Sequence, residues 1–230
     1  TTGTGVTTGL VTASGVGGGS DIEWTVPADM LPDGLAAYIS WSPKPDGGAA
    51  TDKSNTGDAH AGIDGAGWDL ALSHTGVVDG LKVFGAISTI PQTQDSTATT
   101  GATSDKTSWV LGGTYAVGGA TLGYQQSKVD YGMANANAGT ATSTYDNSAY
   151  GVSFSVNDDL SISYGMHKSS RLLNGTGANA IEVKAESFQI AYSMGGATIK
   201  IAETSADNAD YVSTTAGDKE GTTVLLTLAF

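Results

Sequence analysis

Apolar residues recur at every second position in a series of short segments along the chain. In 150–156, for example, Tyr150, Val152, Phe154 and Val156 alternate with glycine and serine. Successive side chains of a β-strand point to opposite faces, so this alternation predicts strands with one apolar and one small, polar face. Helical periodicity is almost absent, which favours an all-β fold. The predicted strands span 21–26, 35–42, 67–74, 80–89, 107–117, 119–128, 147–156, 159–168, 181–194, 196–204 and 221–230, with 5–13 as an optional further strand.

The connections between these strands alternate between short and long. The short ones, such as 157–159 and 194–196, carry Gly, Asn or Asp, which supply the positive φ that tight hairpins need. The long ones, such as 43–66 and 204–220, are polar. A soluble β-sandwich has no reason to place every long loop at one end. Bacterial outer-membrane barrels do so, with short periplasmic turns and long extracellular loops.

The composition is poor in the residues that build a soluble core. The 230 residues include 33 Gly and only 4 Phe, and 14% of them are charged. This shortage is explained if the apolar faces meet lipid and the barrel interior is polar and wet. A closed barrel also satisfies every backbone hydrogen-bonding group in hydrocarbon. Aromatic residues near the predicted strand ends suggest interfacial girdles, although strands favour aromatics in general: Trp24, Trp41, Trp68, Trp109, Tyr115, Tyr192 and Phe230.

Charge and motifs exclude several function classes. The formal net charge of −13 argues against nucleic acid, whose phosphates require clustered Lys and Arg. The absence of Cys excludes disulfides and thiolate metal sites. No hydrolase, phosphate-loop or zinc-protease motif occurs, and His60, His74 and His167 lie in separate segments without metal-ligand spacing. We therefore expect no enzyme activity, no cofactor and no bound metal.

Several segments carry a resemblance to a known family. The terminal "TTVLLTLAF", the stretch "FQIAYSMGGATIKIAET", and "GVGGGSDIEWTVP" leading into "LAAYISWSPK" resemble Gram-negative general porins of the alphaproteobacterial type. The resemblance implies an antiparallel transmembrane β-barrel, with 16 strands in the complete family fold, that assembles as a homotrimer. It also implies that the C-terminal alternation of Leu226, Leu228 and Phe230 is the signal read by the outer-membrane assembly machinery.

The same resemblance frames the domain organisation. We expect one β-barrel domain over 1–230, with 1–20 as the constriction loop that folds into the pore and 21–230 as barrel strands. Only eleven or twelve strands are recognisable in this sequence. About five N-terminal strands of the family fold are therefore expected to be missing. A true twelve-stranded barrel is the alternative, since even strand numbers are the rule.

The expected function is passive diffusion of small hydrophilic solutes and ions through a bacterial outer-membrane channel, with outer-membrane lipid and lipopolysaccharide as surroundings. The acidic net charge favours cations. The alternatives are a secreted or surface-attached structural protein or adhesin, and a barrel with another task, such as an autotransporter translocator or a barrel enzyme. The residues predicted to face the pore are Lys200, Lys82, Glu23, Tyr38, Asp69, Gln125 and His167.

Overall fold

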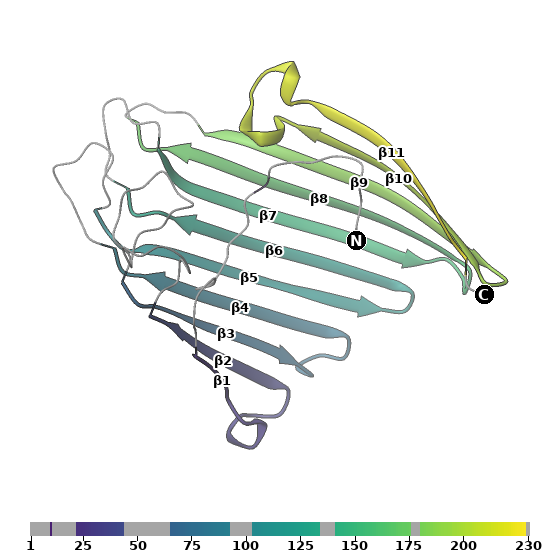
Figure 1. Ribbon diagram of the computed structural model, residues 1–230. Coiled ribbons are helices and arrows are strands. Elements are labelled where there is room, and N and C mark those ends of the chain that lie inside the picture. Colours follow the sequence, from purple (N-terminus) through teal and green to yellow (C-terminus); the bar gives the residue numbers. More distant parts are fainter. Residues whose placement is uncertain are drawn as a thin grey trace.

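The structure is a computed structural model that describes residues 10, 22–43, 65–92, 103–133, 141–175 and 180–228. These residues form one antiparallel sheet of eleven strands that lie side by side in chain order, as Figure 1 shows. The strands are β1 (Ile22–Thr25), β2 (Leu35–Ser42), β3 (Gly67–Thr75), β4 (Leu81–Ile90), β5 (Lys106–Val117), β6 (Ala120–Asp130), β7 (Thr142–Ser155), β8 (Leu160–Leu173), β9 (Ile181–Met194), β10 (Ala197–Asp207) and β11 (Lys219–Leu228).

Helical structure is limited to three short 3₁₀ turns in the described residues. They are η1 (Ala28–Met30) between β1 and β2, and η2 (Ala209–Tyr211) and η3 (Thr215–Gly217) between β10 and β11. No helix of the described part of the chain has the length and apolar character needed to cross a bilayer.

The predicted alternation of connections is confirmed. The connections within the pairs β1–β2, β3–β4, β5–β6, β7–β8 and β9–β10 lie at one end of the sheet, and each is shorter than the connection that follows it along the chain. The extension of β8 to Leu173 leaves only 174–180 between β8 and β9, which is shorter than the 26–34 connection between β1 and β2. At the β9–β10 turn, Gly195 and Gly196 have φ of 54° and 87°, values that residues with a side chain rarely adopt. At the β7–β8 turn, the Asn157 side chain accepts hydrogen bonds from the backbone N–H groups of Asp159 and Leu160.

Several strands run further toward the long connections than the sequence predicted. β7 begins at Thr142 rather than at 147, and β8 continues to Leu173 rather than ending at 168. The apolar alternation stops before the strands do, because Asp146 and Lys168 take the positions that apolar residues hold nearer the tight turns. Pairing of the backbone continues through these polar ends, and the hydrophobic pattern alone could not detect it.

The register sorts the side chains onto two faces. We call the face that carries Trp41, Trp68 and Tyr150 the apolar face, and the opposite one the polar face. Directly paired residues share a face, as do alternate residues of one strand. Trp41 pairs with Trp68, Tyr124 with Tyr150, and Ile162 with Ile190. Toward the tight turns, the apolar face therefore forms a continuous band without a charged residue in the described strands.

Charged residues of the apolar face gather near the long connections of β6–β11. They are Lys128, Asp130, Asp146, Lys168, Glu182, Lys184, Glu186, Glu203, Asp207 and Glu220. Lys168 of β8 pairs directly with Lys184 of the neighbouring strand β9. Glu182 lies 3.2 Å from the Lys168 ammonium and Glu186 lies 2.8 Å from that of Lys184, so carboxylates balance the like charges. The uncharged band thus ends in a polar belt suited to water.

Candidate functional site

The middle of the polar face is lined by small residues. Gly123 of β6, Gly151 of β7 and Gly165 of β8 pair in one lateral row, which Thr114 and Ser187 extend on either side. A hollow of about 330 Å³ lies over this row. A glycine leaves the backbone bare, and the hydroxyl groups beside it can hydrogen-bond to water or to a solute. This part of the polar face is therefore a hydrophilic wall, and its side chains project only a little way from the sheet.

All seven residues predicted to face a pore lie on the polar face of the sheet: Lys200, Lys82, Glu23, Tyr38, Asp69, Gln125 and His167. Three of them come together, because Glu23 of β1, Tyr38 of β2 and Asp69 of β3 line one groove of about 330 Å³. Glu23 and Asp69 both pair with Ser40, which separates the two carboxylates by one strand.

The other four predicted residues are spread over the wall. Gln125 and His167 lie in one row on β6 and β8, with Ala149 of β7 between them. Lys82 is the second residue of β4 and Lys200 the fourth of β10, so both are closer to the tight turns than to the long connections. Lys200 was expected at mid-strand, but β10 continues to Asp207, beyond the predicted end. Neither ammonium group has an ion-pair partner among the described residues.

A cluster of tyrosines covers the polar face near the long connections. Tyr131, Tyr145 and Tyr211 are each less than a tenth exposed, and they pack together with Val129 and Val183. The ring centroids of Tyr145 and Tyr211 are 5.3 Å apart, and those of Tyr131 and Tyr145 are 6.1 Å apart. This tyrosine cluster is the largest apolar core of the described residues, and it lies over the polar face instead of between two sheets.

Two cations contact the tyrosine cluster. The guanidinium of Arg171 lies 4.8 Å from the ring centroid of Tyr211, and the ammonium of Lys106 lies 4.8 Å from that of Tyr131. Arg171 also donates a hydrogen bond of 3.4 Å to the Tyr211 carbonyl. Neither cation was predicted to line the pore, although their positions follow from the strand alternation once β8 and β5 are extended. No strand alternation predicts the position of Tyr211, because this residue lies in the connection between β10 and β11.

The connection that carries Tyr211 folds over the sheet in a strained conformation. Asn208, Asp210 and Tyr211 have φ of 54°, 58° and 57°, and a bulky residue rarely adopts this left-handed region. The Tyr211 hydroxyl lies 2.6 Å from the Oγ of Ser169, which is fully buried. The Asn208 side chain donates to the Glu182 carbonyl at 2.8 Å. These contacts hold the β10–β11 connection against the polar face.

The predicted constriction loop, 1–20, lies outside the described residues except for Leu10. Leu10 is partly buried and packs against the tyrosine cluster. At the other terminus, Leu226 and Leu228 lie on the apolar face of β11, as predicted, while Phe230 is outside the described residues. His60 is also outside them. The described residues contain no group of His, Asp or Glu side chains that could hold a metal ion.

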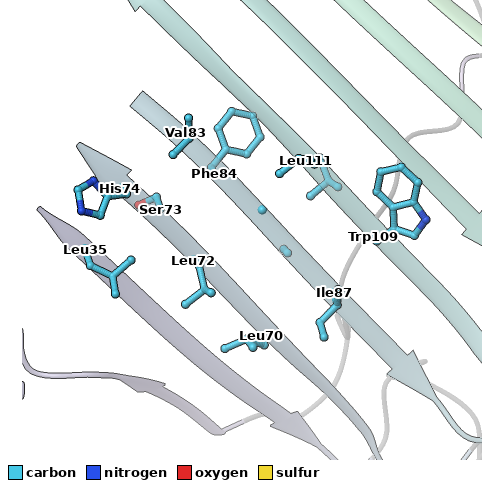
Figure 2. A pocket seen from close by; sticks show the side chains of 13 residues that line it. Leu35, Leu70, Leu72, Ser73, His74, Val83, Phe84, Ile87, Trp109 and Leu111 are labelled. Carbon is cyan, nitrogen blue, oxygen red and sulfur yellow. The ribbon is translucent and has the colours of Figure 1, made fainter. Parts of the chain in front are cut away.

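A larger groove, of about 630 Å³, lies on the apolar face over β2–β5. Figure 2 shows Leu72, Ile87 and Leu111 in its lining. Gly85 pairs with both Leu72 and Leu111, and its missing side chain leaves a gap between them. His74 is among the few polar side chains there. This surface offers apolar contact almost exclusively, so it is the wrong chemistry for a hydrophilic solute. The polar face is the better candidate site.

Comparison of the sequence with known proteins finds no relative. No protein-family model matches the chain, and no curated protein is significantly similar to it.

Comparison of the structure does find neighbours among solved structures. OmpF of Salmonella typhi, solved with daunomycin, has a TM-score of 0.64 at 15% identity over 90% of this chain and 60% of its own. The channel DcaP of Acinetobacter baumannii has a TM-score of 0.56 at 11% identity over 90% and 60%. OmpT of Vibrio cholerae has a TM-score of 0.52 at 12% identity, over 82% of this chain and 54% of its own. The chain thus spans 54–60% of the length of these structures. Its fold is that of the outer-membrane β-barrel porins.

Proposed function

We propose that this protein is a porin-like channel of the bacterial outer membrane that lets small hydrophilic solutes and ions diffuse passively through a water-filled barrel. One observation carries the proposal: the same sheet has an uncharged apolar band on one face and a hollow wall of Gly, Ser and Thr on the other. A sheet with these faces is stable when the band meets lipid and the wall meets water. The proposed mechanism is size exclusion, without catalysis or a cofactor.

Closure of the barrel is part of the proposal. β1 and β11 form the two edges of the sheet, and neither has a second partner strand among the described residues. Unpaired backbone groups at a sheet edge are costly in hydrocarbon, so a membrane sheet must close. We infer that further strands join β1 to β11 in the barrel, in line with the N-terminal strands that the sequence resemblance led us to expect.

Assembly and insertion follow the same reasoning. We infer a homotrimer, which is supported by the trimer form in which V. cholerae OmpT was solved. Leu226 and Leu228 lie on the lipid-facing side of the proposed barrel, as an insertion signal ending at Phe230 would require. Lipopolysaccharide and other outer-membrane lipids would surround the apolar band.

Planar-bilayer conductance of the detergent-extracted native protein tests the function. We expect discrete conductance steps, in groups of three if the barrels are trimeric. Partition into detergent without any conductance would support a membrane barrel and contradict the channel. A protein that stays soluble without detergent would instead support the rival role as a surface structural protein or adhesin, in which apolar faces pack against each other. The exposed apolar residues of the band, such as Leu111 and Tyr124, count against that rival.

A further inference from the structure

The charged residues of the strands divide unequally between the two faces. The polar face carries five basic and two acidic residues: Lys82, Lys106, Arg171, Lys200 and Lys219, against Glu23 and Asp69. The apolar face carries the reverse excess, with Lys128, Lys168 and Lys184 against Asp130, Asp146, Glu182, Glu186, Glu203, Asp207 and Glu220. The net charge of −13 therefore does not describe the wall that a solute would meet.

The cations of the polar face form two groups, one toward each end of the strands. Lys106 and Arg171 lie near the long connections, beside the tyrosine cluster. Lys82 and Lys200 lie in the halves of their strands nearer the tight turns, where both side chains are exposed. Lys219 is neutralised by Asp210, whose carboxylate lies 2.9 Å from its ammonium. A solute moving along the wall would thus pass two successive zones of positive charge.

The acidic residues of the polar face are fewer than the basic ones, and the other acidic residues at the tight-turn end lie at the rim of the sheet. Glu23 and Asp69 lie together in one groove, which residues of β1–β5 line. The tight turns carry further aspartates, including Asp33, Asp79 and Asp158, at the rim of the sheet. Charges in bulk water are screened within about 10 Å at 0.1 M salt. Charges inside a channel with a low-dielectric wall are screened less, and they raise the local concentration of counter-ions.

From this distribution we propose that the channel prefers anions, and that its preferred organic solutes are small carboxylates and other small organic anions. The inference rests on the proposed channel function and reverses the preference for cations expected from the net charge. Lys82 and Lys200 set the preference at the tight-turn end of the lumen. Arg171 and Lys106 set it at the long-connection end.

The reversal potential of the native channel in a KCl gradient tests this preference. We expect the sign that corresponds to chloride permeating faster than potassium. We expect Lys200→Gln and Lys82→Gln each to lower the chloride-to-potassium permeability ratio. For ions passing about 8 Å from the lost charge in water, the ratio should fall by roughly fivefold, because the loss acts by roughly twofold on each ion and in opposite directions on the two. Lys128→Gln is the matched control, since it removes the same charge from the apolar face.

Each outcome bears on a different claim. A preference of the native channel for potassium would overturn the inference while leaving the channel function intact. An equal shift in Lys128→Gln would also overturn it, because the selectivity would then follow total charge and not the polar face. A protein without conductance would overturn the proposed function and the inference together. Competition of chloride current by acetate or succinate, and not by neutral sugars of similar size, would extend the preference to organic anions.

Discussion

Truncation of Tyr211 should release the β10–β11 connection from the polar face. Tyr211 is 4% exposed, it packs on Tyr145, and its hydroxyl shares a hydrogen bond with the buried Ser169. The connection around it holds Asn208 and Asp210 in left-handed conformations. Such conformations cost on the order of 1–3 kcal/mol each and persist only where surrounding contacts compensate for them. The Tyr211 side chain supplies three of these contacts, with the Tyr145 ring, the Ser169 hydroxyl and the Arg171 guanidinium.

The expected effect can be set from the contacts that are lost. Truncating a buried aromatic residue to alanine costs about 3–5 kcal/mol. Since each 1.4 kcal/mol is a factor of ten, the open state of the connection should become at least roughly 100-fold more populated in Tyr211→Ala. Tyr211→Phe keeps the ring but leaves the Ser169 hydroxyl without this partner, and a buried unsatisfied group costs about 1–3 kcal/mol. Its effect should be intermediate.

Hydrogen exchange of the backbone amides in 208–218 measures this opening. In the native protein, the Gly217 N–H donates to the Thr214 carbonyl at 2.8 Å and the Val212 N–H to the Ala209 carbonyl at 3.3 Å. Both amides should exchange faster in Tyr211→Ala, by the factor given above. Val212→Ala is the matched control, because Val212 is the next residue and its side chain is 41% exposed. Equal exchange rates in the two variants would refute the idea that Tyr211 anchors the connection.

Two further predictions concern the wall and the polar belt. Gly165→Tyr should fold and lower the single-channel conductance, because a Cβ there meets nothing closer than the Tyr150 carbonyl oxygen at 3.8 Å and the ring would project into the proposed lumen. Ile162→Tyr, on the apolar face of the same strand, should leave the conductance unchanged. A lower conductance in both variants would count against the assignment of faces. Glu186→Gln should destabilise the extracted protein by at most about 1 kcal/mol in urea unfolding, because it leaves Lys184 opposite Lys168 without its carboxylate. The loss should shrink at high salt and exceed that of Glu220→Gln, whose carboxylate has no ion pair in the described strands.

Much of the fold could be predicted from local sequence patterns. Alternation such as that of Tyr150, Val152 and Phe154 fixes both the strand and its face, because the side-chain period of a strand is two residues. The turn chemistry at Asn157 and at Gly195 marks where the chain reverses. The seven residues predicted on the polar face follow from the same period, which is why all of them lie on that face.

The rest of the candidate site could not be predicted by these means. The loop-side ends of β7 and β8 lack hydrophobic alternation, so Arg171 was assigned to a loop. The tyrosine cluster joins Tyr131, Tyr145 and Tyr211 from three separate parts of the chain, and no local pattern links them. The excess of basic residues on the polar face of the described strands also could not be read from total charge. Which face a charged residue lies on depends on whether its position in the strand is odd or even. For residues such as Arg171 and Lys106, this can be assigned only once the strand is known to extend to them.

The separation of tight turns from long polar connections also gives the sheet a direction of entry into a bilayer. In the proposed barrel, every long connection would have to cross the hydrocarbon once, as a hydrated polar segment, before the strands could settle with the band in lipid. The return crossing would be equally unfavourable, because polar groups would again lose water without gaining partners. The tight turns never need to cross. In the proposed barrel, the length and polarity of these connections would therefore fix the orientation, because inversion would require all of them to cross the hydrocarbon again.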